Sequence, residues 1–213
     1  MTDQSKWSES YITDWEEVEN IQDSNRSQTK ASGQGLKVQI GIPEQTRKEV
    51  SHGLAHLLAD TYALYLKTQN YHWNVTGAQF FELHRMFQRQ YEELGQAVDV
   101  IAERIRILGF LAPGGLHSFA DLTSIKDGDG SADPKDMQLD LLNGHESAIR
   151  RARGILTQFE ATHELDRKNI DTVTQGLLIA RLEAHEKTAW MLRSCLAESH
   201  PAAFKAEGVR LSA

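Results

Sequence analysis

Apolar residues recur at every third or fourth position through four long stretches of this chain, which is the period of an amphipathic α-helix. The stretches cover about residues 44–69, 78–108, 133–163 and 167–200. Only four prolines occur in 213 residues, and they stand before or after these stretches: Pro43, Pro113, Pro134 and Pro201. Because proline is tolerated in the first turn of a helix and interrupts one elsewhere, these positions mark helix boundaries. The sequence predicts an all-α protein.

The connections between the predicted helices differ in length. Asn74–Gly77 and a turn near His163–Asp166 are short, so each joins two antiparallel helices, whereas the connection from about Gly109 to Asp133 is long. A short helix is predicted inside it, over His117–Leu122. Four long helices with one long crossover between helices 2 and 3 is the topology of a ferritin-like four-helix bundle. The buried faces of helices 3 and 4 are predicted to include Leu139 and Trp190.

Residues 1–42 differ in composition from the rest of the chain. They hold seven acidic and four basic residues, and the part from Asn20 to Gly35 has the Ser, Gln, Asn and Gly content of a flexible linker. Before it, four apolar residues at helical spacing leave two interpretations open, a disordered tail and a short docking helix: Trp7, Tyr11, Trp15 and Val18. We therefore predict an acidic, flexible N-terminal extension over 1–42, the bundle over 43–200 and a C-terminal tail over 201–213.

Charge and cysteine content exclude several classes of protein. The formal net charge is −7, and phosphate affinity comes from Lys and Arg, so we expect DNA binding to be weak or absent. The single cysteine, Cys195, cannot form an intrachain disulfide and suits a reducing compartment. No apolar run reaches the length of a membrane span, and no secretory signal begins the sequence, so we predict a cytoplasmic protein without membrane contact.

Histidines and carboxylates at helical spacing are the residues best suited to chemistry. Asp99 and Glu103 are four residues apart and share one face of the second helix, where a solvent-exposed pair balanced by neighbouring arginines is the plain alternative. His72 and His84 flank the predicted hairpin Asn74–Gly77, which folds the chain back and allows the two imidazoles to approach. A lone histidine at either position would be an ordinary core residue, but two together favour a metal site, because imidazole binds iron, zinc and copper.

The geometry of one helix prevents these groups from sharing a metal within one chain. His84 and Asp99 are 15 residues apart on a continuous helix, which separates their backbones by about 22 Å. If all four residues bind one metal, a second copy must supply the carboxylates. A two-fold partner with its second helix antiparallel would do this and would form two equivalent sites.

The sequence resembles the Dps family (DNA protection during starvation) of mini-ferritins. The resemblance covers roughly residues 40–198 and is carried by LAHLLADTYALYLKTQNYHWNVTGAQFFELH, then AVDVIAERI and HEKTAWMLR. It implies a hollow dodecamer with ferroxidase centres at two-fold interfaces, which oxidises Fe(II), usually with hydrogen peroxide, and stores Fe(III) as a mineral. In this pattern His72 and His84 are the histidine ligands, and Asp99 and Glu103 are the partner's carboxylates. Many family members also protect or compact DNA.

Two departures from the family pattern bear on the site. The residue four after the second histidine is usually Asp and here is Gln88, which removes a negative charge; His185 is the candidate replacement ligand, with a core histidine as the alternative. A site rich in histidine would also accept zinc, which has no redox chemistry and would compete with iron. Asp166 and Asp171, near the start of the fourth helix, either line an ion-entry pore or cap the helix.

We therefore predict a cytoplasmic ferroxidase that stores and detoxifies iron. The catalytic and metal-binding residues are predicted to be His72, His84, Asp99 and Glu103, with His185 as an added metal ligand. The alternative is a nucleoid protein that protects DNA and whose iron oxidation is secondary or impaired. Trp73, beside His72, is either a sacrificial electron donor or a packing residue.

Overall fold

The computed structural model describes residues 37–163 and 171–198, and the side chains of residues 159–163 lie outside this description. Residues 37–43 form a loop. Five helices follow: α2 (Glu44–Asn74), α3 (Phe80–Ile107), α4 (Leu116–Leu122), α5 (Pro134–His163) and α6 (Thr172–Glu198). Residues 1–36 of the extension predicted over 1–42 fall outside the described residues, as do the tail over 201–213 and Asp166.

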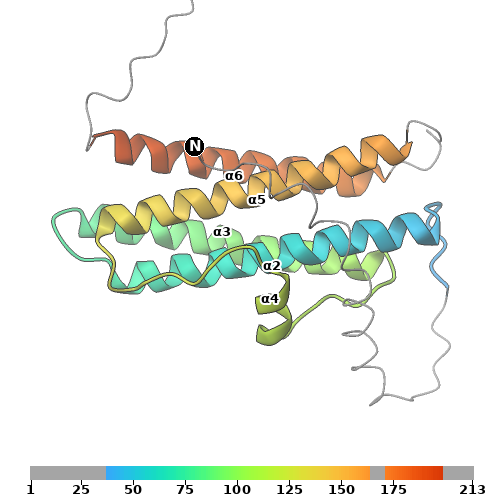
Figure 1. Cartoon of the computed structure of the whole chain (residues 1–213), viewed down its shortest axis with the longest axis horizontal. Coiled ribbons are helices and arrows are strands. Elements are labelled where there is room, and N and C mark those ends of the chain that lie inside the picture. The colour runs from blue at the N-terminus through green and yellow to red at the C-terminus, as the bar shows by residue number, and fades with distance from the viewer. Residues whose placement is uncertain (1–36, 164–170, 199–213) are drawn as a thin grey trace, which may run out of the picture. The chain divides into compact units, whose positions relative to one another are not determined.

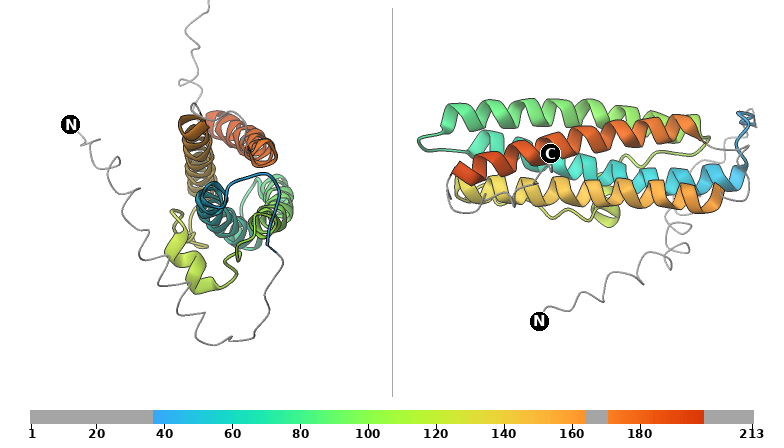
Figure 2. Two further views of the ribbon diagram at one scale, coloured as in Figure 1. Left: turned by 90° about the vertical axis from the view of Figure 1, so that its right-hand side faces the viewer. Right: turned by 90° about the horizontal axis from the view of Figure 1, so that it is seen from above.

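Four long helices lie side by side as a bundle, and α4 lies on the outside against α2 (Figure 1). The view along the bundle shows the four long helices side by side, with α4 on the outside (Figure 2). α2 and α3 run antiparallel, as do α5 and α6 (Figure 1). The long connection that joins α3 to α5 carries the chain back along the bundle. The predicted ferritin-like fold with a short helix in the crossover is confirmed.

The local signals that end the helices act as predicted, with small shifts in the bounds. α2 continues five residues beyond the predicted end, to Asn74, and α3 begins at Phe80 rather than Ala78. Gly109 ends α3 with φ of +99°, and the Phe110 and Gly109 amides donate to the Ile105 and Arg106 carbonyls. This pattern is a Schellman motif, which favours glycine at its left-handed residue.

Two apolar clusters fill the ends of the bundle, and a smaller one made of Leu64, Leu94, Ile125 and Ala148 lies apart from them. Most predicted core positions are buried, but two predictions are wrong: Leu139 is 45% exposed and Trp190 is 62% exposed. The buried stripe of α5 passes instead through Met137, Leu141 and Leu142. Periodicity located the helices, but it did not define the exact edge of each buried face.

A buried carboxylate fixes the crossover to the bundle. Asp60 of α2 is fully buried and forms an ion pair with Arg151 of α5. It also accepts hydrogen bonds from the Thr123 hydroxyl (2.9 Å) and the Ser124 amide (2.7 Å), at the end of α4. α4 therefore has one defined position on the outside of α2.

Candidate metal centre

His72 and His84 face each other across the α2–α3 hairpin. His72 lies in the last turns of α2 and His84 near the start of α3, and their rings stack with centroids 3.8 Å apart. Each imidazole also bonds to the other residue's backbone: Nδ1 of His72 lies 2.8 Å from the His84 carbonyl oxygen, and Nδ1 of His84 lies 2.8 Å from the His72 carbonyl oxygen. The structure brings these two predicted residues together.

These reciprocal hydrogen bonds determine which nitrogen of each ring is available. A carbonyl oxygen only accepts, so each Nδ1 must carry its proton. In a neutral imidazole the remaining Nε2 then has a lone pair, and a backbone carbonyl bound to Nδ1–H is a common arrangement behind a histidine that ligates a metal. The pair is therefore built to present two Nε2 ligands, and its residues fit a divalent transition metal.

Aromatic rings surround the pair. Tyr91 of α3 meets the His72 ring edge-on, with centroids 5.1 Å apart, and Phe80 lies 5.0 Å from His84. His72 is only 8% exposed and His84 is half-buried. The rings limit rotation of the imidazoles, which keeps the two Nε2 atoms in place.

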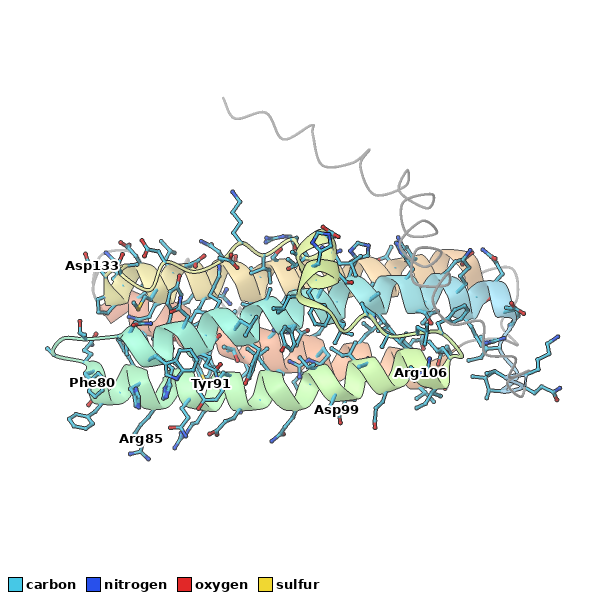
Figure 3. The ribbon with its side chains drawn as sticks, turned by 90° about the horizontal axis from the view of Figure 1, so that it is seen from below. Phe80, Arg85, Tyr91, Asp99, Arg106 and Asp133 are labelled. Carbon is cyan, nitrogen blue, oxygen red and sulfur yellow. The ribbon has the colours of Figure 1, made fainter. Side chains whose placement is uncertain are left out.

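Asp99 and Glu103 lie farther along α3, and both are exposed. Figure 3 shows Phe80, Tyr91 and Asp99 in order along this helix, with Asp99 on its outer side. α3 is unbroken from Phe80 to Ile107, so along the axis Asp99 stays about 22 Å and Glu103 about 28 Å from His84. Across the side chains described, no three His, Cys, Asp or Glu residues gather closely enough to hold a metal ion.

Gln88, at the position where the family pattern has Asp, lies one turn after His84. Its amide nitrogen donates to the Glu92 carboxylate at 2.8 Å. The amide is thus engaged with the next turn of α3, and its neutral oxygen would be a weak ligand for a hard cation.

His185 has a different partner. Its Nδ1 lies 2.9 Å from Nδ1 of His145 on α5, and the Arg181 guanidinium donates to its Nε2 at 3.4 Å. Both histidines are buried, and Arg181 forms an ion pair with Glu93 of α3. Burial lowers the pKa of His145 to about 3 and that of His185 well below its usual value, with nearby Arg181 acting in the same direction, so both rings are neutral.

The sequence reasoning did not connect His145 with His185. They are 40 residues apart, on two successive helices, and only the axial register between α5 and α6 places them together. The single available signal was that each histidine falls on the apolar side of its helix.

Asp171 caps α6, in agreement with the second of its two predicted roles. Its Oδ1 accepts from the Thr174 amide at 2.9 Å and from the Arg104 guanidinium at 2.6 Å, and the residue is 2% exposed. Burial alone would raise the pKa of Asp171, but the hydrogen bonds from Arg104 and Thr174 hold it below its usual value. Arg104 is therefore engaged inside the bundle rather than with the acids on the outer side of α3.

Comparisons with known proteins support the ferritin-like fold. A model of the ferritin-like domain matches residues 52–199. The chain is 30% identical over 149 residues to DNA protection during starvation protein 2 of Bacillus anthracis, covering 70% of this chain and 97% of that protein. The chain belongs to the Dps family of ferritin-like proteins. An uncharacterized low temperature-induced protein of Nostoc sp. (strain PCC 7120) is 36% identical over 162 residues, covering 74% of this chain and 86% of that protein.

The Dps structure from Vibrio cholerae O1 has a similar backbone. The TM-score is 0.68 at 29% identity, covering 78% of this chain and 99% of that one. That protein is described as a member of a broad superfamily of ferritin-like diiron-carboxylate proteins.

In the described part of this Dps-family chain, no helix has the length and apolar content needed to span a membrane.

Proposed function

We propose that this Dps-family protein is a ferroxidase that stores iron in a hollow dodecamer. Fe(II) is its substrate and hydrogen peroxide its preferred oxidant. Each site is formed by His72 and His84 of one subunit with Asp99 and Glu103 of a two-fold partner. Zinc competes with iron for the same ligands, because imidazole and carboxylate also suit Zn²⁺. A cytoplasmic location stays a prediction from the single cysteine.

The observation that carries this proposal is that the histidine ligands of the site lie together in one subunit without a carboxylate ligand beside them in the part of the chain that the structure describes. The stacked histidines present two Nε2 ligands and have no third ligand near them among the described side chains. The missing ligand type, carboxylate, lies exposed farther along the same helix. A two-fold axis that sets α3 antiparallel to its copy near the middle of the helix brings each histidine pair to the other subunit's acids.

Exposed apolar side chains border both halves of the proposed site. Trp73, which directly follows His72, is 65% exposed, and Phe81, three residues before His84, is 75% exposed. Val100 and Ile107, on the same side of α3 as the acids, are 52% and 54% exposed. Large apolar groups in water are costly, so their position around both half-sites favours burial by a second copy.

The residues divide the chemistry between them. The two histidines and two carboxylates bind Fe(II) with neutral and anionic ligands, and the anionic ones favour the Fe(III) product. Oxidation of two Fe(II) ions delivers two electrons to one hydrogen peroxide, whose O–O bond breaks. Two H⁺ ions taken up from the solvent complete two water molecules. No hydroxyl radical is released in this reaction. His185 would have to leave His145 and Arg181 to join the site, so we propose the four-residue set without it.

DNA protection is the second candidate function, favoured by the name of the B. anthracis relative. The charge of this chain argues against strong binding, because a net charge of −7 repels the phosphate backbone. We propose that iron oxidation is the main activity and that DNA binding is weak or absent.

Subunit complementation tests the shared site. Homogeneous His72→Ala and Glu103→Ala proteins should each lose Fe(II) oxidation by peroxide in stopped-flow absorbance. Unfolded, mixed in equal amounts and refolded together, the two variants should recover activity at about a quarter of the sites, because half of the random two-fold pairs are mixed and each has one intact site. Glu183→Ala, at an exposed position of α6, is the matched control for loss of a surface carboxylate. Full activity in either single variant, or no recovery in the mixed assembly, would refute the shared site.

A further inference from the structure

Three tyrosines form a continuous row of rings that begins at the histidine pair. Tyr91 lies edge-on to His72 at 5.1 Å, and Tyr65 of α2 lies 6.0 Å from Tyr91. Tyr62 lies 5.8 Å from Tyr65 and stacks on Phe119 of α4 at 4.7 Å. Every centroid distance is in the range of direct aromatic contact. The row therefore connects the candidate metal centre with the outer helix α4.

The helices place these rings in register. Tyr62, Tyr65 and His72 are spaced by three and seven residues and so share one face of α2. Gly95 of α3 makes room for the middle ring, because a Cβ at this position would lie 3.3 Å from a Tyr65 ring carbon. The Gln69 amide donates to the Tyr65 hydroxyl at 3.3 Å. All three tyrosines are half-buried, so each ring is held by packing and still lies near water.

We propose that Tyr91, Tyr65 and Tyr62 form an electron-transfer chain that supplies the second electron when a single Fe(II) meets peroxide at a half-filled site. This inference rests on the proposed ferroxidase function. One Fe(II) provides only one electron, whereas cleavage of peroxide to two water molecules takes two. A phenol is among the side chains most easily oxidised by one electron, and Tyr91 touches a proposed iron ligand.

The reaction balances as follows. The O–O bond of peroxide breaks as Fe(II) becomes Fe(III) and Tyr91 loses one electron and its phenolic proton. That proton and one H⁺ ion taken up from the solvent complete two water molecules, and a neutral tyrosyl radical remains. Tyr65 then reduces Tyr91, which regains a proton as Tyr65 loses one, and Tyr62 reduces Tyr65 in the same way.

The chain ends at Tyr62, because the phenyl ring of Phe119 is much harder to oxidise. The radical thus leaves the iron site and stops at the α2–α4 contact, where a small thiol reductant in solution returns Tyr62 to the phenol. Without such a path the radical would stay beside the histidines and damage the ligands themselves.

Freeze-quench electron paramagnetic resonance tests the chain in the full assembled protein. Fe(II) is added below one per site, followed by excess peroxide, and the same samples are followed by absorbance for Fe(III). Wild type should show a tyrosyl radical, and Tyr91→Phe should lose it. Tyr65→Phe should confine the radical to Tyr91, with a changed hyperfine pattern and a shorter lifetime. Tyr71→Phe is the control, because Tyr71 lies outside the row and donates its hydroxyl to Asp140.

Each outcome bears on a different claim. Iron oxidation without a tyrosyl radical in wild type, or with the same radical in Tyr91→Phe, overturns the chain and leaves the ferroxidase intact. A radical lost in Trp73→Phe instead would assign the electron to Trp73 and also overturn the chain. Absence of iron oxidation refutes the proposed function, and the chain with it. Phenylalanine keeps the ring, and size-exclusion chromatography verifies that each variant assembles.

Discussion

The buried pair His145 and His185 should make the stability of this protein depend on pH. The folded protein holds the pKa of His145 at about 3 against an ordinary value of 6.5, and it lowers that of His185 as well. Between pH 6.5 and about pH 3, His145 binds a proton in the unfolded chain but stays neutral in the folded protein. The free energy of unfolding therefore keeps the full contribution of this histidine above pH 6.5 and loses it as the pH decreases toward 3.

The magnitude follows from the pKa difference. Each unit of pH below the unfolded pKa costs up to about 1.4 kcal/mol per histidine, so His145 alone removes about 2 kcal/mol between pH 6.5 and about pH 4.5. His185 acts in the same direction. Arg181, which donates to His185, adds to the cost of a second positive charge, and Glu93 is already engaged with Arg181.

Guanidinium unfolding, followed by circular dichroism at a constant protein concentration, measures this loss at the two pH values. The double variant His145→Leu/His185→Leu should lose less stability on acidification than wild type, whereas the control His117→Gln should behave as wild type does. The side chain of His117 is 95% exposed, so its replacement removes a histidine without disturbing the buried pair. If the double variant and wild type lose stability equally, the reasoning from the buried neutral pair is wrong.

Three further outcomes are expected. Asp60→Ala should lower the stability by about 3–5 kcal/mol in chemical unfolding, because Arg151 loses its buried partner; a change below about 1 kcal/mol would contradict that role. Gly109→Ala should lower the thermal midpoint through a cost of about 1–2 kcal/mol at φ of +99°, while Gly114→Ala, with open space around it, should leave it nearly unchanged. In a gel-shift assay at low salt without added metal, the protein should not retain DNA, and tight, salt-resistant retention would overturn the argument from net charge.

Much of the site was predictable because it depends on local structure. His72 and His84 are joined by one short hairpin, so their approach follows from the lengths of two helices and a turn. The separation of Asp99 from His84 follows from the rise per residue of one helix, so residue spacing alone requires a second copy if these groups share a metal. The reciprocal hydrogen bonds to the carbonyls, which free both Nε2 atoms, could not be inferred from residue spacing.

Contacts between elements far apart in the chain needed the tertiary structure. Three such contacts depend on how one helix is rotated and shifted along another. They are the pairing of His145 with His185, the ion pair between Arg104 and Asp171, and the row of tyrosines. The outward positions of Leu139 and Trp190 have the same origin.

The sequence by itself determined the helices, their order, the long crossover and the family, because periodicity, prolines and glycines act within a turn or two of the chain. Only the packed bundle decided the partners of the buried histidines and the edges of each buried face. The physical reason is that the rotation and axial register of each helix are set by the packing of all four apolar faces together. No single segment of the sequence contains that information.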